Sequence, residues 1–386
     1  MKVAERVANL PPYVFAQVGR RIRELESQGM DIIRLDIGSP DLPPPDFILE
    51  AMYRSAKDGS KHGYGGYYGL PALRAAISTY YLRRFGVELD PNTQVAPLIG
   101  SKEGIVNIAL AFVDPGSMVL VPDPGYPTYK LGTLLAGGET YAVPLLPEKD
   151  YLPDLEAIPD EVARAARILW LNYPNNPTGA VAPLAFFERA VAFGEKYDTL
   201  ICHDNPYCDV TFDGYAAPSI LEVPGAMDVV LEFNSLSKAY NMAGWRVGMA
   251  VGNAKAVQTL ARTKTNIDSG IFLPIQDAAI AALTGQQEWL EARNAIYRER
   301  RDLILSGLEQ LGMQARKSQA SLYIWAETPD GYSSWDFATR LLEEVGISIG
   351  AGTIFGKHGE GYLRISLGMS TERIREAMER LQRFAF

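Results

Sequence analysis

The sequence has 386 residues, of which 47% are hydrophobic and 22% charged, and its formal net charge is −9 at pH 7. This apolar content excludes an intrinsically disordered chain, and at about 150 residues per domain the length predicts two or three domains. The negative charge and the lack of a basic cluster argue against binding of nucleic acid, and no apolar run reaches the roughly 18–20 residues of a membrane span.

The few cysteines and histidines predict neither disulfides nor a metal site. Cys202 and Cys208 lack the C-x-x-C spacing, and the three histidines are scattered. This usage indicates a reduced compartment and no zinc site. The first 15 residues, MKVAERVANLPPYVF, carry charge throughout and lack a signal-peptide core. We therefore expect a cytoplasmic protein without a bound metal.

The elements predicted along the chain alternate between helix and strand. A charged helix is expected over 15–29 and a short strand over 31–37, which runs into the turn GSPDLPPP. Further helices are predicted over 70–86, 102–113 and 183–197. Apolar strands are predicted over 117–123, 167–174, 199–207, 228–235 and 245–252. This alternation predicts an α/β fold with a mostly parallel sheet that helices cover on both faces.

After residue 285 the pattern changes to long charged helices, expected over 287–312 and 370–384, with short strands between them. Such a segment is typical of a smaller α+β domain, which the N-terminal residues would join. We therefore expect a large domain over 41–284 and a small domain made of 1–40 and 285–386.

Polar clusters follow the predicted strands directly, in NYPNNP, HDNPY and NSLSK. Ligands of open α/β sheets bind at the carboxyl ends of the strands. We therefore expect the functional site at this edge of the sheet.

The segment NSLSKAYNMAGWRVG is the most informative of these clusters. Lys238 follows an apolar strand, and an amine in such a setting has a lowered pKa and can act as a nucleophile. Ser235, Ser237 and Arg246 would form an anion site suited to a phosphate ester. The alternative is a solvated loop lysine beside an ordinary arginine.

Two segments before this lysine would hold a phosphate and an aromatic ring. Ser101 and Lys102 open a helix, whose free N–H groups and positive end form a phosphate cradle. Tyr126, in the turn PDPGYPTY, could stack on a flat ring. Simple N-capping by Ser101 and packing of Tyr126 are the structural alternatives.

Two further segments would hold the polar atoms of a heterocycle. Asn172, Asn175 and Asn176 surround the prolines of NYPNNP, and such an amide could bind a phenolic oxygen or merely form a turn. Asp204, with Tyr207 after it, ends an apolar strand and could pair with a protonated pyridine nitrogen or cap the next turn.

Taken together, these segments supply a phosphate site, a ring stacker, an oxygen partner, a ring-nitrogen partner and an amine. Pyridoxal 5′-phosphate needs these contacts, because its lysine imine and its pyridinium must both be held.

The chain resembles the fold-type I pyridoxal-phosphate-dependent aminotransferases of class I/II. The motifs LIGSKEG, PDPGYPTY, NYPNNPTG, HDNPY and SLSKAYNMAGWRVG occur in that family's order and span essentially the whole chain. The segments GSKEG, KTNIDSGIF, YRERRDL and GEGYLRISL are most similar to the branch that holds LL-diaminopimelate and related aspartate or alanine aminotransferases. The resemblance implies a seven-stranded-type sheet and a small α+β domain.

The resemblance also implies a role for each matching residue at the cofactor. Lys238 would form the Schiff base and move protons, Asp204 would pair with the pyridine nitrogen, and Tyr207 with Asn176 would bind the ring oxygen. Tyr126 would stack on the ring. The phosphate would be held by Ser101, Lys102, Ser235, Ser237, Arg246 and, from the neighbouring subunit, Tyr64.

Substrate residues follow from the same resemblance. Arg364 would bind the substrate α-carboxylate, and Asn176 would contribute to the same pocket. Gly38 would let the backbone approach that carboxylate, and Tyr13 would line the pocket. From the residues alone, a buried arginine in the strand YLRIS needs an anionic partner. Without the resemblance, packing would explain Tyr64 equally well, and Gly38 would only form a turn.

One segment departs from the family's pattern. Aspartate-specific relatives use a second arginine from the partner subunit, but no arginine occurs between Lys264 and Phe272, where Ser269 lies. The resemblance therefore does not extend to strict aspartate specificity. Lys102, Tyr13 or another group is left to bind a distal carboxylate.

The resulting expectation is a ping-pong aminotransferase that moves an amino group between an L-amino acid and a 2-oxo acid. Glutamate and 2-oxoglutarate would form one pair, and LL-diaminopimelate, aspartate or alanine would belong to the other. A β-lyase or decarboxylase with the same cofactor is the alternative. A cofactor-binding transcription regulator would need an extra DNA-binding module, and only about 30 residues precede the first strand. Shared sites predict a homodimer.

Overall fold

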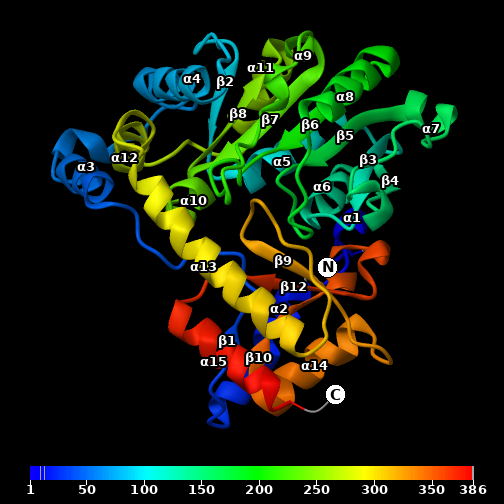
Figure 1. Ribbon diagram of the computed structural model, residues 1–386. Helices are drawn as coiled ribbons and strands as arrows, with labels where there is room; N and C mark the ends of the chain where they lie inside the picture. Colours follow the sequence, from blue (N-terminus) through cyan, green and yellow to red (C-terminus); the bar gives the residue numbers. More distant parts are fainter. Residues whose placement is uncertain (9, 13, 385–386) are drawn as a thin grey trace.

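The structure, a computed structural model, describes residues 1–8, 10–12 and 14–384. Its largest feature is a seven-stranded sheet with the order β2-β8-β7-β6-β5-β3-β4 (Figure 1). Its strands are β2 (Val95–Leu98), β3 (Met118–Asp123), β4 (Glu139–Pro144), β5 (Ala166–Asn172), β6 (Leu200–Asp204), β7 (Val230–Ser235) and β8 (Gly248–Gly252). The run from β4 to β7 is parallel, and β8 is antiparallel to both of its neighbours. The mostly parallel α/β sheet is therefore confirmed.

Helices cover both faces of this sheet because alternate strand residues point to opposite sides. In β5, Ile168 and Trp170 belong to one hydrophobic cluster, whereas Leu169 and Leu171 belong to another. The first cluster includes α5 (Ser101–Phe112), α6 (Thr128–Ala136) and α11 (Ala254–Lys264). The second includes α4 (Pro71–Phe85), α8 (Leu184–Tyr197) and α12 (Leu273–Thr284).

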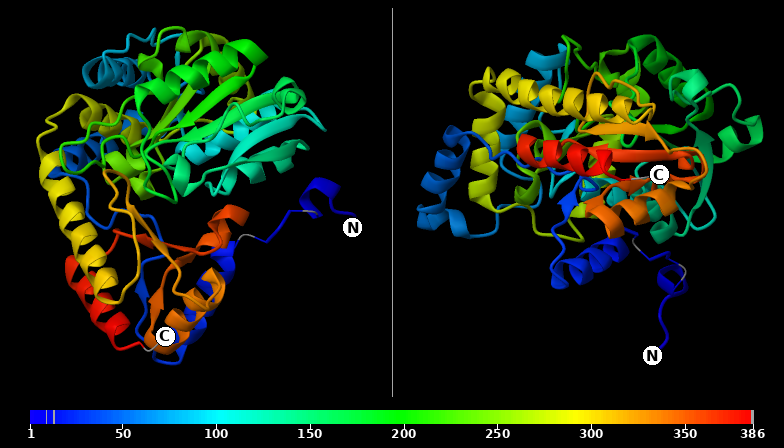
Figure 2. Two further views of the ribbon diagram at one scale, coloured as in Figure 1. Left: turned by 45° about the vertical axis from the view of Figure 1, so that its right-hand side comes forward. Right: turned by 60° about the horizontal axis from the view of Figure 1, so that its bottom comes forward.

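A second group of elements lies below the large sheet in Figure 1. It contains the antiparallel sheet β11-β12-β9 and the parallel pair β1-β10. These strands are β1 (Ile33–Arg34), β9 (Tyr323–Glu327), β10 (Ile347–Ser348), β11 (Gly350–Ala351) and β12 (Tyr362–Ser366). The helices around them are α2 (Val14–Ser27), α14 (Ser334–Val345) and α15 (Thr371–Gln382). Figure 2 shows α13 (Trp289–Gln310) running from the large sheet to this group.

Five further α-helices lie in the described residues. They are α1 (Glu5–Ala8), α3 (Asp46–Ala56), α7 (Asp160–Ala165), α9 (Ala226–Val229) and α10 (Leu236–Ala239). The last of these, α10, follows β7 directly and carries Lys238.

The strand expected over 31–37 is shorter than predicted, because β1 has only two residues. Beyond it the backbone leaves the ladder: the carbonyl of Asp36 accepts from Arg364, and that of Gly38 accepts from Lys238. The expected strand over 245–252 begins at Gly248, after a turn in which Arg246 has a φ of 57°. The strands β2 and β4 were not predicted; β2 contains a proline, and β4 is a partly exposed strand at the sheet edge.

Two kinds of feature are absent from the described residues. No helix there is long and apolar enough to cross a bilayer. Likewise, in the described ranges no group of three or more His, Cys, Asp or Glu side chains is placed to hold a metal ion.

Candidate active site

A cavity of about 410 Å³ lies at the carboxyl ends of β5, β6 and β7 and reaches the small sheet. It brings together most of the predicted site residues, which come from segments far apart in the chain. These are Gly38, Ser101, Lys102, Tyr126, Asn176, Asp204, Tyr207, Ser235, Ser237, Lys238, Arg246 and Arg364. The position of the cavity agrees with the rule for open α/β sheets.

Lys238 carries an amine that is easily deprotonated. Loss of hydration on burial, followed by the positive charges of Arg364 and Arg246, lowers the pKa of Lys238 to about 8. The amine donates a hydrogen bond to the carbonyl oxygen of Gly38, across 200 residues of sequence. About a tenth of the amine is therefore neutral, and nucleophilic, near pH 7.

Asp204 ends β6 and presents a carboxylate with one unsatisfied oxygen. Its Oδ2 accepts a hydrogen bond of 2.7 Å from the Tyr129 hydroxyl, whereas Oδ1 is buried and has no partner. Burial raises the pKa of Asp204 to about 6, and the Tyr129 hydrogen bond opposes this shift. A buried carboxylate oxygen without a partner calls for a cationic or N–H donor in the cavity.

The opposite end of the cavity is suited to a phosphate group. Helix α5 begins at Ser101, and its N-cap residue Gly100 supplies no side-chain acceptor for the first N–H groups. Arg246 donates to Ser237 Oγ at 3.4 Å and lies against Gly100, where a Cβ atom would come within 2.1 Å of its Nη2. Glycine is therefore required for the guanidinium to approach the helix start, and both features attract an anion.

Arg364 is a buried arginine without a carboxylate partner among the described residues. The side chain is 3% exposed; Nη1 donates to Asn176 Oδ1 at 2.9 Å, Nη2 to the Asp36 carbonyl at 2.6 Å, and Nε has no partner. The rings of Tyr323 and Phe355 lie 4.3 and 4.5 Å from its Cζ. The described residues thus supply no anion for this guanidinium. This arrangement fits an arginine that binds the carboxylate of an incoming substrate.

Two predicted residues do not line this cavity. Tyr64 is 91% exposed and lies outside it, so packing within the chain does not explain this tyrosine. Tyr13 lies outside the described residues. Phe15, two positions further, lines the cavity and packs 5.7 Å from the Arg364 guanidinium.

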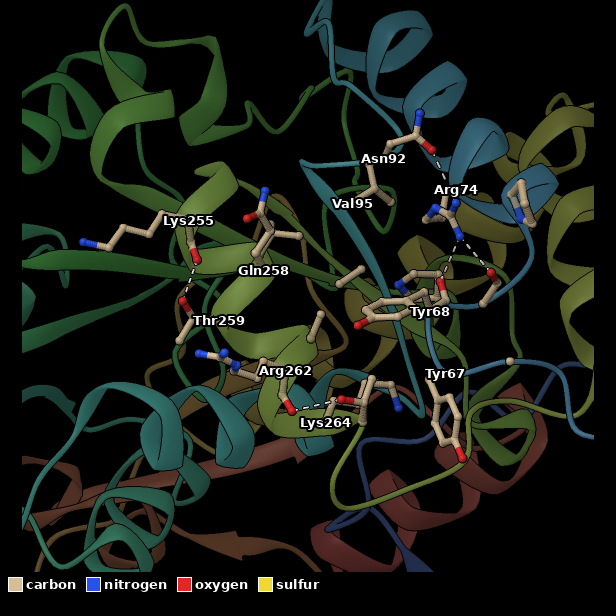
Figure 3. A pocket seen from close by; sticks show the side chains of 18 residues that line it. Tyr67, Tyr68, Arg74, Asn92, Val95, Lys255, Gln258, Thr259, Arg262 and Lys264 are labelled. Atoms are coloured by element: carbon tan, nitrogen blue, oxygen red, sulfur yellow. Dashed lines mark hydrogen bonds between the residues drawn. The ribbon is translucent and has the colours of Figure 1, made fainter.

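A larger concavity, of about 890 Å³, has a different lining (Figure 3). It lies between Tyr67 and Tyr68 on one side and α11 on the other. None of the predicted site residues lines it, and it lacks the strand ends that gather them. We therefore assign the chemistry to the smaller cavity.

The smaller cavity fits pyridoxal 5′-phosphate on three observations. The unpartnered Oδ1 of Asp204 can accept from a protonated ring nitrogen, and the cradle beside Gly100 can take a phosphate. The amine of Lys238 has the lowered pKa that attack on an aldehyde requires. Fold and cavity together define a protein of the pyridoxal-phosphate-dependent transferase type.

Comparison with known proteins identifies the family. The model of the family "Aminotransferase class I and II" matches residues 30–381. The chain is 51% identical to the LL-diaminopimelate aminotransferase of Moorella thermoacetica over 99% of its length and 98% of that protein's. It is 52% identical to the enzyme of the same name from Gloeobacter violaceus, again over 99% and 98% of the two chains. The chain belongs to the class I and II aminotransferases.

Solved structures agree with this assignment. Substrate-bound BacF from Bacillus subtilis superposes with a TM-score of 0.95 at 39% identity, over 99% of this chain and 98% of that one. A Thermus thermophilus aspartate aminotransferase mutant gives 0.93 at 30% identity, over 99% of both chains. The protein is a pyridoxal-phosphate-dependent aminotransferase that moves an amino group between an amino acid and a 2-oxo acid.

Sequence reasoning missed several residues at this site. Tyr129, Tyr323 and Phe355 are aromatic residues for which no role was predicted. A signal was available for Tyr129, because it lies three residues after Tyr126, in the first turn of α6. No local signal marks Tyr323, whose approach to Tyr207 depends on the packing of two separate sheets.

Proposed function

We propose that this aminotransferase acts on LL-diaminopimelate, with glutamate and 2-oxoglutarate as the second pair. The observation that carries the proposal is the identity of about half of all positions, over essentially the full length, to enzymes of that name from different organisms. The absence of an arginine between Lys264 and Phe272 supports it, because strict aspartate specificity would need another cationic group.

The roles proposed for the cofactor-binding residues follow from their chemistry. Asp204 Oδ1 would hold the protonated pyridine nitrogen, while Tyr207 and Asn176 would bind the ring oxygen. Tyr126 would stack on the ring. The phosphate would be held by Ser101, Lys102, Ser235, Ser237 and Arg246. All of these residues line the same cavity, which supports the assignment.

Proton transfer is assigned to Lys238. The cofactor, when bound, supplies an electron sink for the pair of electrons released at the substrate α-carbon. Lys238 Nζ would remove the proton from the substrate α-carbon as general base and then, as general acid, deliver a proton to the C4′ carbon of the cofactor. Its lowered pKa suits both steps near neutral pH, because the amine gains and loses a proton readily there.

Arg364 would bind the substrate α-carboxylate. Its buried guanidinium has a free Nε and lacks a carboxylate partner in the described chain. Asn176 and the Asp36 carbonyl would hold the guanidinium plane, and the backbone of Gly38 would approach the same carboxylate. This fork-to-fork pairing would orient the α-carbon toward Lys238.

A homodimer with shared sites is part of the proposal. Tyr64, Tyr67 and Tyr68 are exposed, and so are Ile267 and Phe272. The two segments adjoin each other: a Cβ at Gly270 would lie 2.5 Å from the Gly66 carbonyl oxygen. An apolar surface of this kind is typical of a subunit interface and would present Tyr64 to the neighbouring phosphate.

The organisation of the chain is proposed as predicted, with a large domain over 41–284 and a small domain made of 1–40 and 285–386. The pairing of β1 with β10 supports this division, because it attaches the N-terminal segment to the C-terminal elements. A cytoplasmic location is proposed from the two free, buried thiols of Cys202 and Cys208.

A half-reaction screen tests the substrate proposal. The holoenzyme is mixed with LL-diaminopimelate, meso-diaminopimelate, glutamate, aspartate, alanine or phenylalanine, and conversion of the bound cofactor to its amine form is followed by absorbance. Fast conversion by LL-diaminopimelate and glutamate is expected. Fast conversion by another donor alone would contradict the substrate. Release of ammonia with pyruvate, or of carbon dioxide, would instead indicate a β-lyase or a decarboxylase.

A further inference from the structure

Tyr323 stands between the two polar ends of the cavity. It belongs to β9, is 2% exposed, and lines the cavity together with Tyr207 and Arg364. Its hydroxyl lies 2.9 Å from the Tyr207 hydroxyl, and the two rings meet edge to face at 5.6 Å. Tyr323 thus touches both the cofactor-side phenol and the buried guanidinium.

The hydroxyl pair has a directional requirement. A phenol has one proton to donate, and its oxygen can accept at the same time. If Tyr207 donates to the ring oxygen of the cofactor, it has no proton left for Tyr323. Tyr323 must then be the donor, and the chain of bonds runs from Tyr323 to Tyr207 to the cofactor. Phenylalanine at 323 would leave Tyr207 without a donor.

A donor behind Tyr207 strengthens its own donation. Hydrogen bonds that are linked in series in a buried site polarise one another, so that each bond becomes stronger. Both hydroxyls belong to buried side chains, since Tyr207 is 4% and Tyr323 2% exposed. The Tyr323 hydroxyl therefore makes Tyr207 a better donor to an oxygen that carries negative charge.

The ring of Tyr323 has a separate contact. The Arg364 Cζ atom lies 4.3 Å from the ring centroid, within the range of a cation–π interaction. This face-on contact, together with Asn176 and the Asp36 carbonyl, fixes the guanidinium plane. Loss of the ring would free the guanidinium to move.

Gly38 makes this position of Tyr323 possible. A Cβ atom at Gly38 would come within 1.8 Å of the Tyr323 hydroxyl oxygen, which no side chain could tolerate. The backbone of Gly38 also accepts from Lys238. The position of the Tyr323 hydroxyl therefore depends on the packing of three separate segments, which carry Tyr323, Gly38 and Lys238.

We propose that Tyr323 is a positioning residue with two roles: its hydroxyl donates to Tyr207, so that Tyr207 donates to the cofactor, and its ring holds Arg364 for the substrate carboxylate. The inference rests on the proposed function of Tyr207 and Arg364. It adds a residue that couples the cofactor end of the cavity to the carboxylate end.

The hydroxyl role is tested by spectroscopy of the holoenzyme rather than by turnover. Donation to the ring oxygen lowers the proton affinity of the Lys238 nitrogen that shares a proton with it, and hence lowers the pH midpoint of the visible band. In Tyr323→Phe this midpoint should rise by about 0.2–0.6 pH unit. In a Tyr207→Phe background, the same substitution should cause no further shift.

The ring role is tested by steady-state kinetics with two substitutions. Tyr323→Phe keeps the ring, so KM for the amino acid should stay within twofold of wild type. Tyr323→Leu removes it, and KM should rise by about 3–10-fold. The matched control is Tyr297→Phe, which removes another buried hydroxyl, one with no hydrogen-bond partner in the described chain. It should change neither the midpoint nor KM.

The outcomes separate this inference from the proposed function. Equal midpoints in wild type and Tyr323→Phe would overturn the hydroxyl role, as would an undiminished shift in the Tyr207→Phe background. An equal KM in the leucine variant, once thermal unfolding shows it to be folded, would overturn the ring role. If wild-type protein with cofactor develops no visible band, the proposed function itself fails, and this inference fails with it.

Discussion

At the scale of single residues, the cavity holds two ionisable groups far from their ordinary pKa values. Burial lowers the pKa of Lys238 to about 8 and raises that of Asp204 to about 6, so both are pushed toward neutrality. An amine that is easily deprotonated and a carboxylate with one unpartnered oxygen are complementary to an aldehyde and a pyridinium. The site is thus prepared for the cofactor before it arrives.

Competitive acetylation of the cofactor-free protein measures the pKa of the Lys238 amine. Reactivity of its amine should rise about tenfold per pH unit below pH 8 and level off above it, because only the neutral amine reacts. Peptide mass spectrometry gives the profile. Lys61 is the internal control, because its hydrogen bond to Asp277 raises the pKa of that amine above 10.5. A Lys238 midpoint near that of Lys61 would contradict the expectation.

The substitution Tyr129→Phe tests the role of the hydrogen bond that the Tyr129 hydroxyl donates to Asp204. The Tyr129 hydroxyl lowers the pKa of Asp204, so its loss should raise that pKa further and weaken the pairing with the pyridinium. Because a hydrogen bond to a charged group contributes about 1.5–3 kcal/mol, cofactor affinity should fall by roughly 10–100-fold. Equilibrium dialysis with absorbance measures it. An unchanged affinity would show that Asp204 does not need this donor.

At the scale of secondary-structure elements, α5 is held close to the sheet by a glycine. A Cβ at Gly104 would lie 2.5 Å from Leu98 Cδ1 and 3.0 Å from Phe233 Cε1, both in the packed core. The start of α5 carries Ser101, so its distance from the sheet sets the position of the phosphate cradle. Packing and binding are linked through this one helix.

Gly104→Ala should therefore lower the free energy of unfolding by about 1–3 kcal/mol through overpacking and weaken cofactor binding. Gly132→Ala is the matched control in α6, where the nearest atom to a new Cβ is 3.5 Å away. There alanine should stabilise the protein by about 0.5–1 kcal/mol through its helix propensity. Urea unfolding compares the two; equal effects would refute the role of close packing.

The sequence allowed the elements that build the site to be predicted, but not all of their contacts. Strand ends at Asp204 and Ser235 were predictable because polar motifs follow apolar runs directly. The shortness of β1 was not, because the carbonyls beyond it bind side chains from distant segments. Nor was Tyr323, since its role depends on where two sheets meet.

At the scale of the whole molecule, α13 ties the large sheet to the small one. Arg293 donates to the carbonyls of Asp209 at 2.6 Å and Lys238 at 3.1 Å. The second of these residues lies on α10, just after the carboxyl end of β7. Two turns later, Arg300 pairs with Asp41 at 2.6 Å and reaches the Leu367 carbonyl. One helix therefore connects the two walls of the cavity.

Burial of Lys238 has a cost for the cofactor-free fold. Below pH 8 the amine is protonated in both the folded and the unfolded chain, so the full cost of holding a desolvated charge is present. Between pH 8 and 10.5 the unfolded chain binds more protons than the folded one, and stability rises with pH. The 2.5-unit difference between about 8 and 10.5 corresponds to roughly 2–4 kcal/mol.

Lys238→Met should accordingly make the cofactor-free protein more stable than wild type by about 2–4 kcal/mol at pH 7. The difference should shrink as the pH rises from 8 to 10.5. Urea unfolding at several pH values measures it, and Lys255→Met, at an exposed position on α11, should have little effect. Equal stability of wild type and Lys238→Met at pH 7 would show that burial of the Lys238 amine does not destabilise the cofactor-free protein.

This cost bears on the life of the enzyme in a cell. A newly made chain must fold around an amine and an acid that both prefer water, and only capture of the vitamin B6 vitamer relieves them. Copies that wait for the vitamer unfold more often and are exposed to proteolysis. We therefore expect the amount of enzyme at steady state to follow the vitamin supply when its synthesis is constant.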